Sequence, residues 1–527
     1  MRLDRRSFLK AGFGGAALLG VGVSGCASHP GAAAVEPGTN PFRHGVASGD
    51  PLADRVILWT RVSPERGRLG EPVEVDWWIA RDARGRDRIA EGRLDALPEH
   101  DFTLKVDATG LEPGRDYHYG FATRAGESPI GRTRTLPDER VERLRLAFVS
   151  CSNYPHGFFN AYADLAERDD VDVVIHLGDY FYEYANEAYG DGSAIGRISD
   201  PTHEVVSLED YRRRHACYKA DPDLQAAHAS HPWITVWDDH ESANNAWKDG
   251  AKNHHPERGE GEWSERRLAA IRAYYEWMPI RDLPTELFRT FRIGRLAEII
   301  MLDTRLAGRD EQVSGTDDEG AEDPTRTLLG EEQEGWLFDA LTRSQEDGIV
   351  WRVVGQQIVL SPLGSASGEF NPDSWDGYRE SRRRLLGHIE ASSIEDVIFL
   401  TGDVHSTWGI DVPPPTGSDE TYDPKSGAGA RAVELVAPAV SSRPLGWNPA
   451  AVEFFEDAAD RYPYVRYMNL ENNGYGILDL DFERARVQWF FVETVERRSR
   501  QGHCSPVFES RLGTNHLVQV EGASCDP

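Results

Sequence analysis

Acidic and histidine residues follow three apolar segments of the sequence, each of which predicts a buried β-strand. The segment 397–400 runs into Gly-Asp-Val-His at 402–405, the segment 171–177 runs into Gly-Asp at 178–179, and the segment 233–237 runs into Asp-Asp-His-Glu at 238–241. In open α/β sheets, ligands bind beyond the carboxyl ends of the strands. Carboxylates and imidazoles at three strand ends therefore predict a hydrolytic site that holds more than one metal ion.

A cysteine and a tyrosine add two less common metal ligands to this set. Cys151 follows the strand predicted at 144–149, and Tyr182 lies three residues after Asp179. A thiolate beside a highly charged metal binds iron better than calcium or magnesium. A tyrosine needs a strong Lewis acid such as ferric iron, because its pKa of about 10 must fall below neutrality. Core packing is the alternative for Cys151, and an aromatic pocket wall is the alternative for Tyr182; taken alone, Tyr182 fits the wall better.

The acidic segment 238–241 has a second interpretation as a solvated surface face. Because it follows a very apolar strand, we expect its oxygens to gather around a hard cation such as Ca²⁺ or Mg²⁺. Asn244 and Asn245 follow one helical turn later, and the sequence does not decide which of them reaches the site.

The length and charge of the chain limit the classes of protein that it can be. A chain of 527 residues is too long for one compact core, so two domains are expected. The formal net charge of −30 argues against a nucleic-acid-binding surface, which needs a basic patch. The acidic excess is explained most simply by the solubility of an exported protein.

The first 34 residues predict an export signal. Arg5 and Arg6 begin a twin-arginine box, and the apolar run after it is shorter than the ~20 residues that span a membrane. Cys26 fits a lipoprotein processing site, and ordinary cleavage near 32–34 is the alternative. We expect the twin-arginine export machinery as a partner and a periplasmic, secreted or lipid-anchored location. Contact with the membrane would then occur only through a lipid on Cys26.

The remaining chain predicts an α+β protein of two domains and a tail. Residues 40–138 predict a β-sandwich of the immunoglobulin or fibronectin type, because Leu-x-Pro-Gly-x-x-Tyr-x-Tyr at 111–119 resembles a corner of such sandwiches. Strands alternate with helices after residue 138, which places a catalytic domain at 142–510. Residues 511–527 form the expected tail, which a disulfide between Cys504 and Cys525 could fasten.

Together, the ordered motifs resemble those of the PhoD-like alkaline phosphatases, a family of the metallophosphoesterase superfamily. The matching segments are 42–51 (Phe-Arg-His-Gly-Val-Ala-Ser-Gly-Asp-Pro), 150–151 (Ser-Cys), 178–182 (Gly-Asp-Tyr-Phe-Tyr), 237–241 (Trp-Asp-Asp-His-Glu), 302–305 (Leu-Asp-Thr-Arg), 354–357 (Val-Gly-Gln-Gln) and 402–405 (Gly-Asp-Val-His). The resemblance covers essentially the whole mature chain. It implies a calcineurin-like catalytic domain in which two stacked β-sheets are flanked by helices.

The resemblance also implies a role for each candidate residue. Asp179 would bridge two metal ions and act in catalysis. The residues implied around Fe³⁺ are Cys151, Asp179, Tyr182 and His405, and those implied around Ca²⁺ are Asp179, Asp239 and Asp403.

The substrate would meet a second group of residues. His240 would contact the phosphate or protonate the leaving oxygen, and Asn244 or Asn245 would bind substrate or metal. Arg305 could bind phosphate or support the structure, and the structural role is favoured.

These roles predict an exported, metal-dependent and monomeric phosphatase. It would hydrolyse phosphate mono- and diesters by attack of a metal-bound hydroxide, whose pKa is lowered by coordination. One alternative is a phospholipase D-like phosphodiesterase. The other is a non-catalytic surface binding protein on the same fold, which is disfavoured because every proposed ligand position holds a competent residue. The sequence leaves the natural substrate open.

Overall fold

The computed structural model describes residues 39–138, 141–282, 287–313, 319–363, 371–414, 422–458, 462–523 and 525. The predicted export signal at 1–34, including Cys26, lies outside these residues. Within the described ranges, no helix combines the length and the apolar character needed to cross a membrane.

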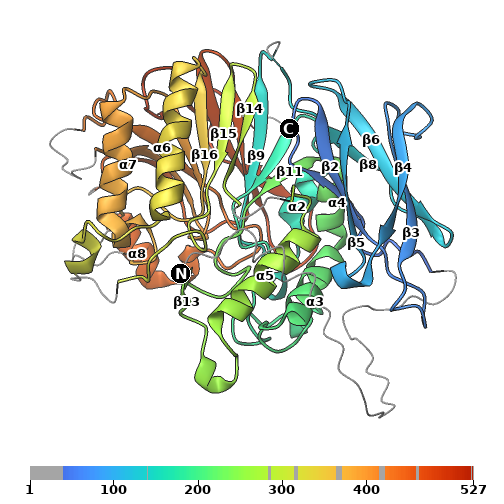
Figure 1. The fold of residues 1–527 in the computed structure, drawn as a ribbon. Coiled ribbons are helices and arrows are strands. Elements are labelled where there is room, and N and C mark those ends of the chain that lie inside the picture. Colours follow the sequence, from blue (N-terminus) through green and yellow to red (C-terminus); the bar gives the residue numbers. More distant parts are fainter. Residues whose placement is uncertain are drawn as a thin grey trace.

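Two large mixed sheets form the body of the molecule (Figure 1). Among the residues that the structure describes, the first has eleven strands and the second has seven. The path of the first sheet is β25 (Val518–Gln519), β24 (Phe508–Arg511), β22 (Arg484–Val492), β21 (Gly474–Leu480), β9 (Leu144–Val149), β10 (Val173–His176), β11 (Pro232–Thr235), β1 (Val46–Gly49), β2 (Arg55–Arg61) and β5 (Thr103–Thr109), with β23 (Gly502–Cys504) beside β22. The path of the second is β14 (Arg289–Ile293), β15 (Ala297–Met301), β16 (Trp351–Gly355), β17 (Val397–Thr401), β19 (Ala432–Val436), β18 (Thr407–Val412) and β20 (Val465–Asn469).

Alternating side chains of the second sheet enter two different cores. Ile299 and Ile398 join the core that also contains Phe148 of the first sheet, whereas their neighbours Ile300 and Phe399 face the helices on the other side. This period of two is the geometry of a strand. Because both faces are buried, these strands are continuous apolar runs in the sequence.

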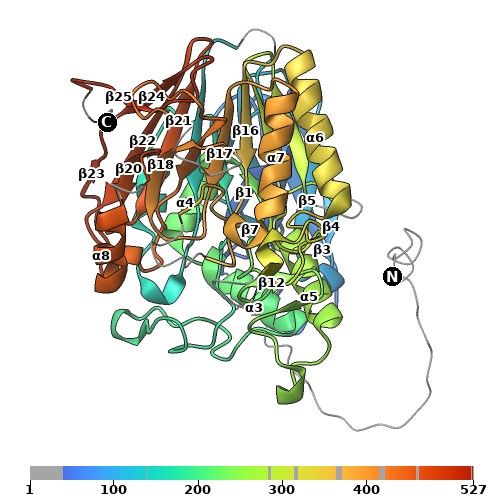
Figure 2. The ribbon, with the colours of Figure 1, turned by 90° about the vertical axis from the view of Figure 1, so that its left-hand side faces the viewer.

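Helices cover the outer faces of both sheets. α6 (Gly330–Glu346) and α7 (Arg379–Ala391) lie side by side on the second sheet (Figures 1 and 2). The other α-helices in the described ranges are α2 (Asn160–Leu165), α3 (Leu208–Lys219), α4 (Pro222–Ser230), α5 (Trp263–Trp277) and α8 (Pro449–Ala458). The sequence pattern predicts a helix over 157–168, but α2 is shorter. Residues 157–159 of the predicted helix are not helical, because the Phe158 amide donates to the Val495 carbonyl oxygen (2.7 Å).

The N-terminal region shares its sheet with the rest of the molecule. Its core lies between two layers: strands β2 and β5 of the first sheet form one, and a separate five-stranded sheet forms the other. That sheet contains β3 (Val73–Ala80), β4 (Arg88–Ala96), β6 (Asp116–Thr123), β7 (Gly126–Glu127) and β8 (Gly131–Arg134). Inside the predicted 111–119 corner, Tyr117 Oη accepts from the Glu112 amide (2.8 Å). However, β1 pairs in parallel with β11, so the first sheet continues into the body; the domain boundaries remain a prediction.

The C-terminal segment is fastened as the cysteine pattern suggested, because Cys504 and Cys525 form a disulfide.

The sheets and helices together confirm a mixed α+β architecture. The immunoglobulin-like and calcineurin-like descriptions remain finer predictions.

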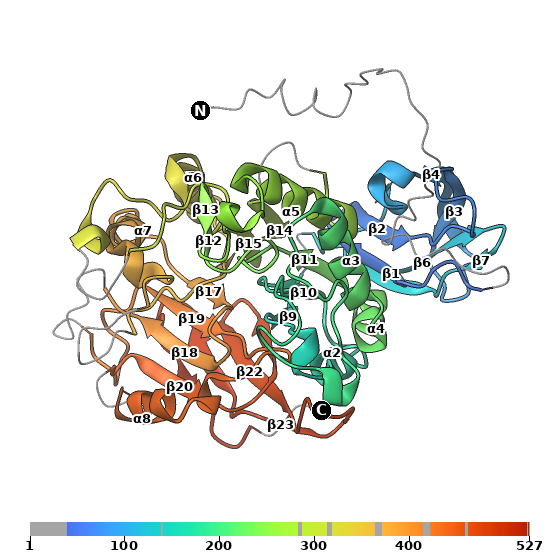
Figure 3. The same ribbon diagram turned by 90° about the horizontal axis from the view of Figure 1, so that it is seen from below.

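The carboxyl ends of several strands meet at one edge of the two sheets. β9, β10 and β11 are mutually parallel in the first sheet, and β17 belongs to the second. Ser150, just after β9, forms a bridge to Ala439, just after β19, and joins the two sheets at this edge. Seen from below, β9, β10 and β17 lie near the middle of the molecule (Figure 3).

Candidate metal centre

The structure brings the predicted metal ligands together at this edge. Cys151 follows β9, Asp179 follows β10, Asp239 follows β11, and Asp403 and His405 follow β17. Potential ligand atoms lie within 4.8 Å of one another in each of three groups. The groups are Cys151, Asp179 and His405; Asp179, Asp239 and His240; and Asp238, Asp239 and Asp403. Asp179 and Asp239 each belong to two groups, so the groups form one continuous centre.

The backbone at these positions adopts an uncommon conformation. Cys151, Asp179, Asp403 and His405 have φ values of 62°, 55°, 64° and 49°. Non-glycine residues rarely occupy this left-handed region, and such residues cluster at functional sites where the surrounding structure holds them. This conformation turns the backbone sharply after each strand, which directs the side chain into the shared site.

Tyr182 lies among the members of the first group. Its hydroxyl donates to Asp179 Oδ2 (2.9 Å), lies 2.9 Å from His405 Nε2 and accepts from Ser442 Oγ (2.7 Å). Tyr182 is buried, and Tyr189 Oη lies 3.4 Å from the other ring nitrogen of His405. The Tyr182 oxygen therefore points into the centre rather than lining an aromatic wall alone.

The segment 238–241 is buried rather than solvated. Asp238 and Asp239 carry ligand atoms in the third group, but Glu241 has another role. Its carboxylate accepts from the backbone amides of Asp238 (2.8 Å), Asp179 (3.1 Å) and Tyr180 (2.6 Å). Glu241 thus links the turn after β10 to the turn after β11.

Arg305 connects four carboxylates from three segments of the chain. Its guanidinium donates to Asp238, to Asp373 Oδ2 (2.7 Å) and to Asp403 Oδ1 (3.1 Å), and it lies 3.6 Å from Asp239 Oδ1. The Arg305 side chain has no exposed surface. Because its donors are occupied by protein carboxylates, this geometry agrees with the structural role favoured for it.

His240 is held by a carboxylate that the sequence analysis did not select. Glu183 Oε2 lies 2.7 Å from His240 Nδ1, and Glu183 Oε1 accepts from the Asn244 amide (2.7 Å). The Asn245 amide donates to Asp239 Oδ2 (2.6 Å). Both asparagines therefore lie beside the centre and contact it through their backbones.

Burial opposes ionisation of the carboxylates in the centre. Burial, reinforced by neighbouring carboxylates, raises the pKa of Asp179 and Asp238 well above their ordinary values; burial also raises the pKa of Asp403 to about 7. Asp179 Oδ1, Asp238 Oδ2 and Asp239 Oδ1 are buried without a hydrogen-bond partner in the structure. Unpaired buried oxygens of this kind fit the ligand set of bound cations.

Burial also opposes ionisation of the thiol and the phenol at the centre. Burial raises the pKa of the Cys151 thiol and the Tyr182 hydroxyl well above their ordinary values, and the Asp179 carboxylate adds to both shifts. A cation at the first group would oppose these effects, because coordination favours the deprotonated ligand.

Sequence reasoning missed four supporting residues: Glu183, Asp373, Tyr189 and Ser442. Glu183 directly follows Tyr182, so its place beside a predicted ligand was a usable signal. Asp373 and Ser442 lie far from the recognised motifs in sequence, and only the fold brings them to the centre.

Comparisons with known proteins agree with this geometry. The family model described as PhoD-like phosphatase matches residues 146–489, and the model described as PhoD-like phosphatase, N-terminal domain, matches residues 25–137. Alkaline phosphatase D of Bacillus subtilis (strain 168) is 41% identical over 430 residues, which are 77% of this chain and 72% of that protein. A solved structure described as "Structure of PhoD" matches with a TM-score of 0.80 and 32% identity, covering 93% of this chain and 94% of that chain.

The fold and the site thus define a hydrolase of phosphoric esters, which confirms the predicted class of enzyme. The chain belongs to the PhoD-like phosphatase family.

Replacing Arg305 tests whether it holds the centre together. In Arg305→Lys, a single ammonium cannot reach the carboxylates that the planar guanidinium joins. We expect the free energy of unfolding to fall by about 3 kcal/mol, as when a buried ion pair is broken. Urea denaturation measures this change. The matched control is Arg292→Lys, whose partner Asp347 is half exposed, and an equal effect in both variants would contradict the role of Arg305.

Proposed function

We propose that this chain hydrolyses phosphate mono- and diesters at a centre that holds Fe³⁺ and Ca²⁺. The observation that carries the proposal is the overlap of the three ligand groups, in which Asp179 and Asp239 are shared. A shared carboxylate is what a bridge between neighbouring cations requires.

The first group supports ferric iron. Cys151, Tyr182 and His405 supply sulfur, phenol oxygen and imidazole nitrogen around Asp179. A thiolate and a phenolate both favour a strongly acidic, thiophilic metal over Ca²⁺ or Mg²⁺. The Ser442 hydroxyl donates to the Tyr182 oxygen, which also stabilises a phenolate.

The third group supports a hard cation. Asp238, Asp239 and Asp403 present only carboxylate oxygens, which are the ligands that Ca²⁺ prefers. Asp239 and Asp403 are the proposed ligands. Asp238 orients Arg305, although its unpartnered Oδ2 also faces the group.

Bound cations would supply charge neutralisation for the phosphoryl oxygens and an activated water. The chain itself positions the substrate and the proton donor. Glu183 engages His240 Nδ1, which leaves Nε2 as the ring nitrogen that faces the substrate. From there, His240 holds a proton for the leaving oxygen. Asn244 and Asn245 orient the phosphate from the loop after β11.

Metal analysis tests the composition of the centre. We expect protein purified without added metal to contain iron together with calcium. In Asp179→Asn, the content of both metals and the phosphatase activity should fall. Changing a residue that only supports a metal ligand lowers affinity or activity by roughly 10–100-fold, and we expect a larger loss here because Asp179 is a proposed ligand itself. Elemental analysis and phosphate release measure the two effects. Asp169→Asn, at an exposed position, is the control. Zinc as the only metal would contradict the roles of Cys151 and Tyr182.

The leaving group tests His240. In His240→Ala, hydrolysis of an alkyl phosphate should slow by about 10²–10⁴-fold, because an alkoxide needs a proton to leave. Hydrolysis of p-nitrophenyl phosphate should slow much less, since nitrophenolate is a stable anion. Glu183→Gln should shift the ratio of the two rates in the same direction by a smaller factor.

The control for His240 is His203→Ala, because His203 is an exposed histidine that also contacts a carboxylate. Equal losses for both esters in His240→Ala would show that His240 binds phosphate and does not protonate the leaving group.

We also propose export of the monomer by the twin-arginine route, based on Arg5 and Arg6. The mass of the mature N-terminus distinguishes a lipid on Cys26 from cleavage near residues 32–34. A mature chain that retains residues 1–34 would contradict the export signal.

A further inference from the structure

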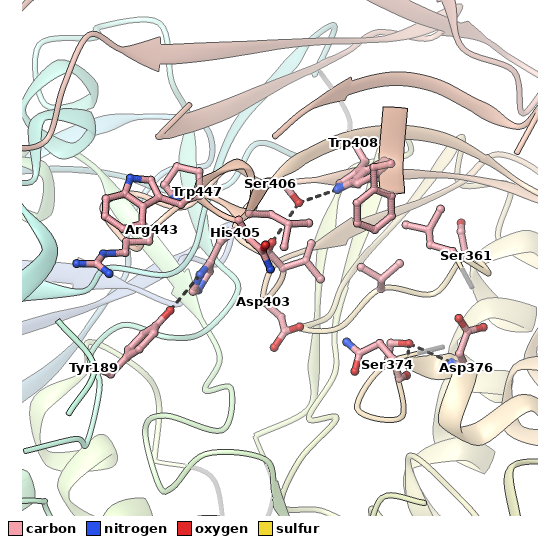
Figure 4. Close-up of a pocket in the computed structure, with 18 residues that line it drawn as sticks. Tyr189, Ser361, Ser374, Asp376, Asp403, His405, Ser406, Trp408, Arg443 and Trp447 are labelled. Carbon is pink, nitrogen blue, oxygen red and sulfur yellow. Dashed lines mark hydrogen bonds between the residues drawn. The ribbon is translucent and has the colours of Figure 1, made fainter. Parts of the chain in front are cut away.

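A cavity of about 520 Å³ opens directly beside the centre. Asp403 and His405 form part of its wall, and Tyr189 and Arg443 lie near His405 (Figure 4). The volume lies in the range of small-ligand pockets. Because the cavity and the metal centre share wall residues, a group attached to a bound phosphate can enter it.

The remaining wall is largely apolar. The apolar side chains come from the loop after β16, the β17–β18 turn, β18 itself, the short 3₁₀ helix η8 (Leu445–Trp447) and α8. They are Val359, Leu363, Val404, Trp408, Leu445 and Phe455.

Several polar groups in the wall already bond to the protein; the Ser361 hydroxyl, which is buried without a hydrogen-bond partner among the described residues, is an exception. Ser406 Oγ accepts from Trp408 Nε1 (2.8 Å) and donates to the Val404 carbonyl oxygen (3.1 Å). Ser374 Oγ donates to the Asn371 carbonyl oxygen (2.9 Å). Asp376, on the same side as Ser374 in Figure 4, is paired with the buried Arg382. A polyhydroxylated group would therefore lose its bonds to water and find few free partners.

An aromatic residue marks the mouth of the cavity. The side chain of Trp447 is 69% exposed, and the Arg443 guanidinium lies 4.2 Å from its ring centroid. Large exposed aromatic residues that line a cavity indicate a ligand contact. Stacking of the guanidinium on the indole holds the ring at the mouth.

We propose that this cavity is a substrate subsite that binds the apolar alcohol portion of a phosphate ester. The phosphoryl group then lies at Asp403 and His405, and the alcohol extends past Trp408 toward Trp447 and Phe455. The subsite rests on the proposed function, because it assumes that the phosphate binds at the metal centre. It names the substrate class as esters of aliphatic or aromatic alcohols and disfavours sugar and glycerol phosphates.

Unbranched alkyl phosphates test the subsite in the wild-type holoenzyme. Their alcohols have nearly equal basicity, so differences in kcat/KM report on binding of the chain. Each added methylene should raise kcat/KM about fourfold, from about 0.8 kcal/mol per buried CH₂, until the cavity is filled. Butyl phosphate should thus exceed methyl phosphate by on the order of 50-fold. Glycerol phosphate, which is similar in size but polar, should stay close to methyl phosphate.

The two proposals fail in different ways in this experiment. If none of the esters is hydrolysed, the proposed function is wrong. If all of them are hydrolysed with the same kcat/KM, or if glycerol phosphate is preferred, only the subsite is wrong.

Variants at the mouth locate the effect. In Trp447→Ala and Phe455→Ala, the ratio of kcat/KM for butyl over methyl phosphate should fall at least fivefold. Phe482→Ala, a partly exposed phenylalanine that does not line the cavity, should keep the wild-type ratio. An unchanged ratio in both mouth variants would overturn the assignment.

A binding measurement gives a readout that does not depend on turnover. Butylphosphonate and methylphosphonate cannot be cleaved at the P–C bond by ester hydrolysis, and calorimetry measures their Kd. We expect butylphosphonate to bind at least tenfold more tightly to the wild-type holoenzyme and to lose most of this advantage in Trp447→Ala. Equal affinities in the wild-type protein would overturn the subsite.

Discussion

The crowding of carboxylates in a buried space is the constraint on which this structure depends. Asp179, Asp238, Asp239 and Asp403 converge where two sheets meet. Burial raises the pKa of Asp179, Asp238 and Asp403, and repulsion between neighbouring carboxylates adds to these shifts. Arg305 neutralises part of this charge and binds segments of both sheets to each other. The unpaired oxygens that remain are the reason why the centre suits cations. Arg305 therefore stabilises the fold, and the carboxylate oxygens that it does not pair are available to bind cations.

The geometry of the centre is maintained by the backbone around it. Four ligand candidates adopt left-handed φ values, each of which costs on the order of 1–3 kcal/mol. Glu241 offsets this cost by accepting three backbone amides from the turns that carry Asp179 and Asp238. Ser442 does the same for the first group, because its hydroxyl lies within hydrogen-bond distance of both the Cys151 carbonyl oxygen (2.9 Å) and the Tyr182 hydroxyl (2.7 Å). Rigid strands and these cross-links keep the ligand atoms close despite their repulsion.

Polar and apolar surfaces are separated on either side of Asp403 and His405. The metal-binding side is charged and buried, whereas the cavity side presents aliphatic and aromatic groups, and several of their polar neighbours are already hydrogen-bonded. This division matches the two ends of a phosphate ester, one anionic and one organic. Recognition of the phosphoryl group and recognition of the alcohol can therefore be altered separately by substitution.

Local patterns in the sequence were sufficient to predict the strands, the residues at their carboxyl ends, the family and the class of reaction. Apolar runs that end in Gly-Asp or Asp-His have a direct physical meaning, because the ends of parallel strands meet at one edge. The short range of these patterns also explains what they could not show. The bonds of Arg305 to Asp373 and Asp403 join residues 68 and 98 positions apart. In the first sheet, β1 pairs with β11 although β2, β5, β9 and β10 lie between them in the sequence. Glu241 as a link between turns, Ser442 beside Tyr182 and the apolar cavity were decided only by the tertiary structure, because contacts between distant segments depend on how the two sheets are stacked.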